Sequence, residues 1–474
     1  PNWWCGRRRA RRQALSLGQY RSISIGQIAI RCRNNRHWPL SIASLAMETQ
    51  ALMTLTSMRE TETTRPADQC AGESTAIATP PAGGPSLVCV GGEDHHLRIP
   101  FLVALRERGI NVKAIGSGKS AAFSDAAIPY SGYELARFVD PAADRRTVRH
   151  LRSLLSRDPP DLVQSFDTKP NLLAPLAAAG LPGVRTVRTI NGMGWVYSAR
   201  NPAALALRPV QRMLHRRAAR HVAATVFQNA DDLALFTRHG MLGSGTYCLV
   251  RGSGIDVTDF EAKLALTAPA ASLRAEFGLG DAPVVMTVTR LTRQKGVGTL
   301  LAAAARVHAV RPDVRFVLVG AWETEGWMAI RPAEIERHRP YVLATGSRPD
   351  VPALLNAANI FAFPTEYREG VPRVLLEAGM AELPIVTTDM PGCNDVVRNG
   401  WSGVIVPPRN PRGLAAAILG LLDDPAGARV LGARASARVR YEFGLELIVN
   451  RYCDLYRSLL GRTAARLAGA APGI

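Results

Sequence analysis

The residues best suited to chemistry lie at 369–377, which read Glu-Gly-Val-Pro-Arg-Val-Leu-Leu-Glu. Pro372 suits the first turn of a helix, and Gly370 lets a ligand approach the backbone closely. The free N–H groups and the dipole at a helix start favour a phosphate. Glu369 and Glu377 could then accept hydrogen bonds from hydroxyls at the two ends of one bound molecule. A nucleotide-sugar has this layout, although the two glutamates taken alone could be ordinary helix-end residues.

Two cations follow an expected strand at 284–289. Arg290 can hold a diphosphate in a bidentate fork, and Lys295 can act on it as a point charge. A merely solvated pair of cations would be unusual here, because cations at a helix start oppose the helix dipole. The chain contains no Asp-x-Asp pair, so we expect no metal ion at the site. The two cations and the helix start at 370–373 would instead stabilise the negative charge of a leaving diphosphate.

Strands and helices alternate through the first half of the chain. Apolar runs predict strands at 87–90, 111–115, 162–165, 184–189 and 224–228. Apolar residues at turn spacing predict helices at 97–108, 145–157, 172–179 and 202–220. Strand–helix–strand units of this kind imply a parallel sheet.

The second half repeats the pattern. Strands are expected at 284–289, 315–319, 341–344, 360–364, 384–387 and 403–406, and helices at 298–308, 332–337, 351–357 and 372–381. The fold class is therefore α/β, with two Rossmann-like doubly wound domains facing across a cleft. Ligands of such sheets bind beyond the carboxyl ends of the strands. Ala, Thr and Pro interrupt the pattern over 261–271, so we expect the domain boundary there.

The net charge of +19 is unevenly distributed. Residues 1–46 hold nine arginines and no acidic residue, which leaves +10 for the rest of the chain. The chain begins with Pro1, and Met47, Met53 and Met58 follow, so we expect residues 1–46 to precede the natural start of the protein. The alternative is a basic arm that binds nucleic acid or lipid headgroups. We expect residues 1–85 to be a basic tail and linker.

Three groups of motifs in the second half resemble the nucleotide-sugar domain of the retaining family-4 glycosyltransferases, which have the GT-B fold. They are Thr-Arg-Leu-Thr-Arg-Gln-Lys-Gly at 289–296, the stretch 363–378 with its Glu-x7-Glu signature, and Pro-Gly-Cys-Asn-Asp-Val at 391–396. In the first half, the stretches 168–171, 189–197, 227–232 and 251–256 resemble the branch that builds bacterial polysaccharides on polyprenyl-diphosphate carriers. The resemblance covers about residues 86–460.

The resemblance implies a role for each domain. Residues 86–265 would form the acceptor-binding domain, with a C-terminal helix at 441–460 packing back on it, and residues 266–440 would bind the nucleotide-sugar. Glu369, Arg290 and Lys295 would be the catalytic residues. Donor-binding positions would be Gly91, Gly92, Arg98, Ser347, Arg348, Gly370, Val371, Arg373 and Glu377, with Asn191 as a possible contact to the donor sugar. No metal site and no cofactor are expected, since the nucleotide-sugar is a co-substrate.

The function so implied is retaining transfer of a sugar, from a UDP-sugar, to a polyprenyl-diphosphate-linked saccharide in cell-surface polysaccharide biosynthesis. A GT-B-fold sugar-nucleotide epimerase and a basic nucleic-acid-binding protein are the alternatives, and with a phosphorylated donor no nucleic-acid partner is needed to explain the charge.

The expected location is the cytoplasmic face of the cell membrane. The seven cysteines form no Cys-x-x-Cys pair, which fits a reducing compartment. No apolar run is long enough to span a bilayer. Arginines and apolar residues share the segment 207–220, which predicts an amphipathic surface helix able to rest on anionic lipid, although a solvated helix face is an equal alternative.

Overall fold

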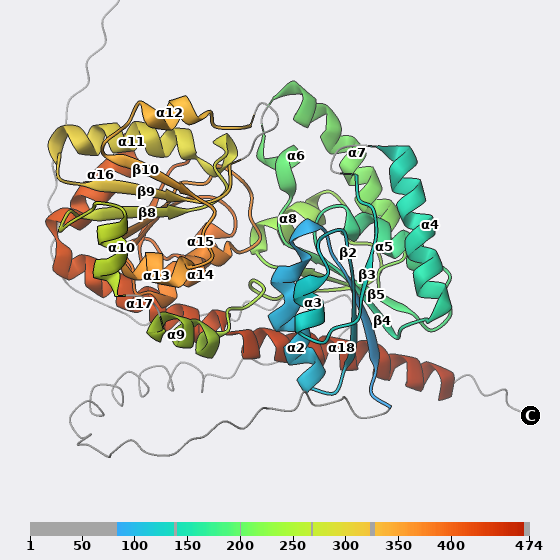
Figure 1. The fold of residues 1–474 in the computed structure, drawn as a ribbon. Coiled ribbons are helices and arrows are strands. Elements are labelled where there is room, and N and C mark those ends of the chain that lie inside the picture. Colours follow the sequence, from blue (N-terminus) through green and yellow to red (C-terminus); the bar gives the residue numbers. More distant parts are fainter. Residues whose placement is uncertain (1–82, 137–139, 200, 267–268, 323–327, 469–474) are drawn as a thin grey trace, which may run out of the picture. The chain divides into compact units, whose positions relative to one another are not determined.

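The structure is a computed structural model that describes residues 83–136, 140–199, 201–266, 269–322 and 328–468, with side chains described as far as 461. The arginine-rich segment 1–46 and nearly all of the expected linker lie outside the described residues. The described part contains two parallel sheets, each covered by helices on both faces, and therefore has the predicted α/β class (Figure 1).

The first sheet has seven strands in the order β3-β2-β1-β4-β5-β6-β7. They are β1 (Ser86–Val90), β2 (Asn111–Gly116), β3 (Tyr130–Gly132), β4 (Leu162–Ser165), β5 (Arg185–Ile190), β6 (Ala224–Phe227) and β7 (Thr246–Leu249). Between them run the 3-10 helix η1 (Glu93–Arg98) and the helices α2 (Ile99–Glu107), α3 (Ala121–Asp125), α4 (Pro141–Arg157), α5 (Pro170–Ala178), α6 (Gly194–Ser198), α7 (Pro202–Ala219) and α8 (Ala230–Arg238).

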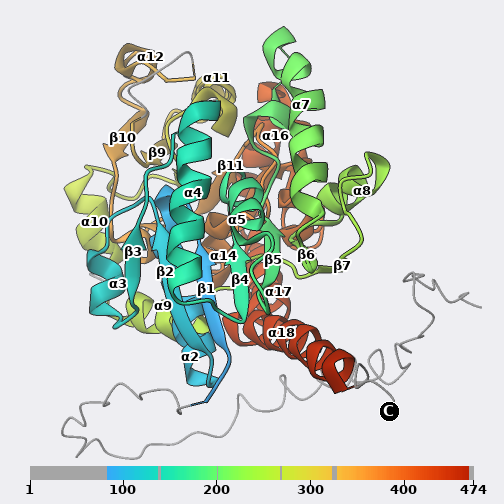
Figure 2. The same cartoon turned by 90° about the vertical axis from the view of Figure 1, so that its right-hand side faces the viewer.

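The side chains of β1 show why this sheet is covered on both faces. Leu87 and Cys89 are buried in one hydrophobic cluster with α2, and Val88 and Val90 are buried in another with α4 and α5. Successive residues of a strand point to opposite faces, so an apolar run of this kind needs a helix layer on each side. Figure 2 shows α4 and α5 lying over one face of the sheet.

The second sheet has six strands in the order β10-β9-β8-β11-β12-β13. They are β8 (Val284–Val288), β9 (Arg315–Val319), β10 (Val342–Gly346), β11 (Ile360–Phe363), β12 (Ile385–Thr388) and β13 (Val404–Val406). The intervening helices are η2 (Arg293–Lys295), α11 (Val297–Val310), α12 (Pro332–Glu336), α13 (Val351–Asn356), α14 (Arg373–Met380) and α15 (Cys393–Val396), followed by α16 (Pro411–Asp423) and α17 (Pro425–Phe443).

Two helices occupy the segment where a boundary was expected, α9 (Val257–Ala265) and α10 (Ala270–Glu276). The side chain of Asp256 caps α9 by accepting a hydrogen bond from the N–H of Asp259, as N-terminal caps do. Phe260 and Leu273 are buried in the core of the second sheet. Two short helices that pack on the second sheet therefore occupy parts of the segment 261–271.

The last helix, α18 (Leu445–Ala468), packs on the first sheet rather than on the second (Figure 1). The hydroxyl groups of Tyr452 and Thr189 lie 2.8 Å apart, and the hydroxyl of Tyr456 donates to Oε1 of Gln164 at 2.9 Å. The expected single helix 441–460 is wrong in one respect, because α17 ends at Phe443 and α18 begins after Gly444.

Candidate active site

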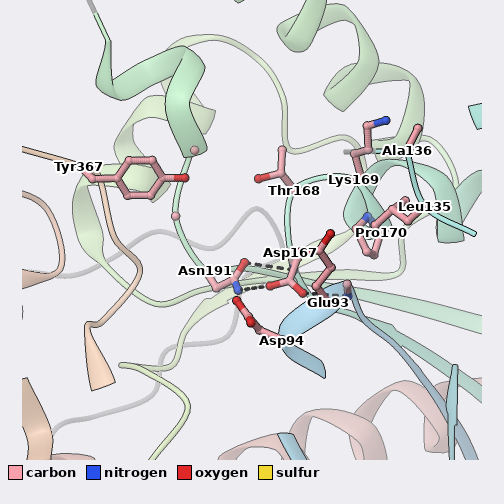
Figure 3. Close-up of a pocket in the computed structure, with 13 residues that line it drawn as sticks. Glu93, Asp94, Leu135, Ala136, Asp167, Thr168, Lys169, Pro170, Asn191 and Tyr367 are labelled. Atoms are coloured by element: carbon pink, nitrogen blue, oxygen red, sulfur yellow. Dashed lines mark hydrogen bonds between the residues drawn. The ribbon is translucent and has the colours of Figure 1, made fainter. Parts of the chain in front are cut away.

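A cavity of about 280 Å³ opens at the carboxyl ends of β1, β4 and β5. It is lined by the loop after β1, the segment 167–170 after β4, residues 191–194 after β5, and Tyr367 from the loop before α14 (Figure 3). In the first sheet the chain order turns back between β1 and β4. Loops diverge at such a point and leave a crevice for ligands, so the cavity lies where the fold places a binding site.

Asp167 organises the floor of this cavity. Its carboxylate accepts hydrogen bonds from the backbone N–H of Gly92 at 3.0 Å and from Nδ2 of Asn191 at 2.7 Å, and its own N–H donates to Oδ1 of Asn191 at 3.1 Å. Its backbone is left-handed, with φ of 70°, a conformation that aspartate tolerates better than most residues. Asn191 and Gly92, two of the expected donor contacts, are therefore held together by a carboxylate.

The loop after β1 needs glycine because of a buried histidine. A Cβ atom on Gly91 would lie 2.0 Å from Nδ1 of His95. Burial lowers the pKa of His95 to about 4, so its imidazole is neutral at pH 7. In the same short segment, Glu93 and Asp94 point outward and line the cavity.

Lys295 and Glu369 form an ion pair beside this cavity. Their side chains are only 13% and 16% exposed, so water screens the two charges weakly. The ammonium of Lys295 also lies 5.7 Å from the ring centre of Phe363 and 5.3 Å from that of Tyr367, where cation–π attraction restricts it. The pair places one cation and one carboxylate, both in defined positions, at the proposed catalytic centre.

Gly296 makes the position of Lys295 possible. Its φ is 75°, and a Cβ atom there would lie 1.8 Å from the carbonyl oxygen of Pro364 at the end of β11. Only glycine allows this close packing without strain. The turn η2 is thereby pressed against the strand that leads to Glu369.

The segment 369–370 contacts the first half of the chain directly. Glu369 forms an isolated antiparallel bridge with Gly192. Nδ2 of Asn229 donates to the carbonyl oxygens of Glu369 at 3.0 Å and of Gly370 at 3.2 Å. A Cβ atom on Gly370 would lie 2.1 Å from Oε1 of Gln228, so the glycine is required by packing as well as by any ligand.

A buried ion pair secures the same contact. The Nη2 atom of Arg368 lies 2.8 Å from Oδ1 of Asp232, a residue with no exposed surface. Asn229 donates to the other carboxylate oxygen at 3.0 Å. Burial raises the pKa of Asp232, and the charge of Arg368 and its hydrogen bond oppose this shift. Asp232 thus links the β6–α8 turn to the residue that precedes Glu369.

The helix α14 carries the second glutamate of the motif. Pro372 is its N-cap residue, and among the described residues no side chain caps this end, so the first N–H groups of the helix can accept an anion. Nε of Arg373 lies 2.9 Å from Oε1 of Glu377. Burial raises the pKa of Glu377, and Arg373 acts in the opposite direction. Val371 packs against Gly252, where a Cβ atom would come within 3.1 Å.

The remaining expected site residues lie in three different segments of the chain. Arg290 follows β8, is exposed, and its charge lowers the pKa of Tyr367, which burial and Glu369 raise. Arg98 donates to the hydroxyl of Ser253 and lies over the ring of Phe166. Arg348, after β10, is held by Asp350 at 2.7 Å and Glu276 at 2.8 Å, and its neighbour Ser347 is exposed. None of these four residues lines the cavity.

Several residues that the structure brings into the site were assigned no role from the sequence, although some lie in the motifs 227–232 and 363–378. They are Glu93, Asp94, Asp167, Tyr367, Arg368 and the polar group of Gln228, Asn229 and Asp232. Asp167 could have been found, because it follows a strand at the carboxyl edge of the sheet, where ligands bind. The contacts of Arg368 and Asp232 join residues 136 positions apart, and no local pattern indicates them.

Solved structures share the architecture of this chain. Anabaena Alr3699/HepE in complex with UDP superposes with a TM-score of 0.64 and 18% identity, covering 79% of this chain and all of that chain. Sucrose-phosphate synthase from Thermosynechococcus elongatus gives a TM-score of 0.66 at 21% identity, covering 80% of this chain and all of that chain. At these identities the likeness shows the fold, and the predicted GT-B fold is confirmed.

Two family models match the chain, glycosyl transferase 4-like domain at residues 101–251 and glycosyl transferases group 1 at residues 282–424. Together they cover more than half of its length, and the chain belongs to the glycosyltransferases that combine these two domains. The resemblance seen in the sequence motifs is thus confirmed at the level of the family.

The relatives of this chain include two bacterial glycosyltransferases. The N,N'-diacetylbacillosaminyl-diphospho-undecaprenol alpha-1,3-N-acetylgalactosaminyltransferase of Campylobacter jejuni is 25% identical over 370 residues, or 77% of this chain and 96% of the relative. The capsular polysaccharide biosynthesis glycosyltransferase CapM of Staphylococcus aureus is 28% identical over 182 residues, which are 38% of this chain and 48% of CapM. The match therefore covers nearly the full length of the Campylobacter jejuni enzyme and about half the length of CapM.

Proposed function

We propose that this glycosyltransferase moves a sugar from a UDP-sugar to a polyprenyl-diphosphate-linked saccharide in bacterial polysaccharide biosynthesis. The observation that carries the proposal is the ion pair of Lys295 and Glu369, whose side chains are little exposed. Glu369 also forms a β-bridge with Gly192, which lines the cavity at the carboxyl ends of β1, β4 and β5. The named relatives include a transferase acting on an undecaprenol-diphosphate saccharide and one of capsular polysaccharide biosynthesis. A solved structure of the same fold is a complex with UDP.

The chemistry follows from where charge develops. Breaking the bond between sugar and diphosphate leaves negative charge on the diphosphate and positive character on the sugar carbon. Lys295, Arg290 and the start of α14, which no described side chain caps, would stabilise the first charge. Glu369 would contact the donor sugar and Glu377 the ribose. We propose retention of configuration by attack on the same face, with the leaving phosphate oxygen taking the proton of the acceptor hydroxyl.

The proposed reaction is tested by supplying the purified protein with UDP- and GDP-sugars, with and without a polyprenyl-diphosphate-linked saccharide. We expect UDP release that depends on the acceptor, and an α-linked product from an α-linked donor by NMR. Release of nucleotide that is equally fast without acceptor, or an epimerised donor, would favour the alternative of a sugar-nucleotide epimerase.

The helix α7 supports a place at a membrane surface. Leu205, Val210 and Met213 are 45–58% exposed on it, Arg217 and Arg220 at its C-terminal end are also exposed, and the helix holds no acidic residue. Within the described residues, no helix is long and apolar enough to cross a membrane. Arg208 and Arg212 instead contact α6 through the carbonyl of Val196 and the hydroxyl of Tyr197. The basic surface of α7 therefore contains fewer arginines than the five present in 208–220.

Replacing Arg217 and Arg220 by serine should weaken binding to phosphatidylglycerol vesicles by roughly 30-fold, because each arginine near an anionic surface contributes about 1 kcal/mol. Binding is measured by vesicle sedimentation at fixed ionic strength. The control is Arg306→Ser with Arg337→Ser, which removes two exposed arginines from the second half and should bind as the parent does. Equal losses in both variants would show a general charge effect and remove α7 from the proposal.

A further inference from the structure

The cavity beside Glu369 has an unexpected charge for so basic a protein. Among its lining side chains, Glu93, Asp94 and Asp167 are carboxylates, and Lys169 is the one cation. Lys169 lies 2.8 Å from Asp144 of α4, and Figure 3 shows its amino group directed away from the other polar side chains. A ligand in the cavity therefore meets a negative wall, although the chain as a whole carries +19.

The three carboxylates differ in what already engages them. Asp167 is held by Gly92 and Asn191, whereas the carboxylates of Glu93 and Asp94 have no hydrogen-bond or ion-pair partner within the described residues and line the cavity as exposed side chains. In the described part of the chain no group of three or more acidic, histidine or cysteine side chains is arranged to hold a metal ion. These carboxylates are thus placed to accept hydrogen bonds from a ligand.

We infer that this cavity receives the reacting sugar of the acceptor, and that it selects an uncharged sugar over a uronic acid or other anionic sugar. The inference rests on the proposed function and specifies its acceptor. Sugar hydroxyls donate strong hydrogen bonds to carboxylates, and the hydroxyl group of Tyr367 points into the same cavity from the other side (Figure 3). A carboxylate on the ligand would face like charges in a partly closed site, which disfavours it.

The same wall argues against a diphosphate in the cavity. Lys295, Arg290 and the start of α14, which suit a diphosphate, belong to the second half of the chain. The acidic side chains that line the cavity come from segments that connect strands of the first sheet. Of the expected donor contacts, Gly92 and Asn191 line the cavity, and since they hold Asp167 we reassign them to the acceptor side. The diphosphate of the donor would then lie against the second half, and the neutral reacting sugar against the first.

A matched pair of probes tests the selection. Octyl β-glucoside and octyl β-glucuronide, below their micellar concentrations, differ by one carboxylate, and their affinity for the UDP-loaded protein can be compared by ligand-observed NMR titration. We expect the glucuronide to bind at least tenfold more weakly than the glucoside. In the double variant Glu93→Gln with Asp94→Asn, this ratio should fall to about threefold or less. The control Glu107→Gln with Asp125→Asn removes two exposed carboxylates from α2 and α3 and should keep the parental ratio.

The outcomes separate this inference from the proposed function. Equal affinity of the parent for both probes, no binding of the glucoside, or an equal change in the control variant would overturn the inference. UDP binding is measured in the same samples by thermal stabilisation. If UDP stabilises the protein and the selection is absent, the inference fails alone, whereas absence of any UDP effect would count against the proposed function itself.

Discussion

Replacing Lys295 by methionine is expected to lower kcat/KM for sugar transfer by about 10²–10³-fold, the usual effect of removing one group that stabilises transition-state charge. Methionine keeps much of the length of the side chain and its packing between Phe363 and Tyr367, so the fold should persist. The substitution removes the cation proposed to act on the leaving diphosphate. It also leaves the carboxylate of Glu369 without its ion-pair partner.

The matched control is Lys113→Met. Lys113 is an exposed lysine of β2 that pairs with Asp158, and its loss should change kcat/KM by less than twofold. Circular dichroism checks that both variants are folded. A Lys295→Met enzyme that keeps more than a third of the parental kcat/KM would contradict the assignment.

The pair itself is tested with Glu369→Gln. If Lys295 and Glu369 act together, the double variant should lose much less activity than the product of the two single losses, as interacting residues do. Fully multiplicative losses would mean that the two residues act independently, in spite of their contact.

Replacing Arg368 by alanine is expected to lower the free energy of unfolding by about 3–5 kcal/mol, because it leaves a buried carboxylate without its cation. Asp232 has no exposed surface, and Arg368 is its ion-pair partner. Urea denaturation followed by circular dichroism measures the loss. The control Arg311→Ala breaks an exposed pair with Asp313 and should cost no more than about 1 kcal/mol.

Two further measurements identify the cause. Adding Asp232→Asn to Arg368→Ala should restore part of the stability, since the uncompensated charge is then absent. Burial already raises the pKa of Asp232 in the parent, and losing the guanidinium raises it further. The folded variant then binds a proton more readily than the unfolded chain does, so its stability falls as pH rises. The loss of unfolding free energy in Arg368→Ala should be smaller at pH 5 than at pH 8. A loss that does not change with pH, together with no recovery of stability on adding Asp232→Asn, would contradict this account.

The elements of the fold were largely predictable because they depend on local patterns. The strands at 162–165 and 315–319 were placed at their observed bounds, and most other elements lie within a few residues of expectation. Their burial on both faces makes each strand a short apolar run. The strands β3 and β7, the helices α3, α6, α8, α9, α10, α15 and α16, and most of α17 were missed. Many of these elements are short, and polar or small residues interrupt the apolar pattern of α8, α9 and α10. The helix α16, by contrast, carries apolar residues at turn spacing that were overlooked.

The candidate site was predictable only in part. The motif residues Lys295 and Glu369 do meet, whereas the side chain of Arg348, an expected donor-binding residue, forms ion pairs with Glu276 and Asp350. Pairs such as Asp167 with Asn191 and Arg368 with Asp232 depend on how distant loops pack together. A single sequence carries no periodic signal for such pairs, so the structure was needed to find them.

The return of α18 to the first sheet has a consequence for how the chain folds during synthesis. The residues that complete the core around α2, among them Ile448, Tyr452 and Tyr456, leave the ribosome more than 190 residues after the last strand of that sheet. Domains generally fold in the order of their translation. Here the second sheet can complete its fold first, while the first sheet still lacks α18 and leaves an apolar face exposed. A chain truncated before residue 445 would keep that apolar face uncovered.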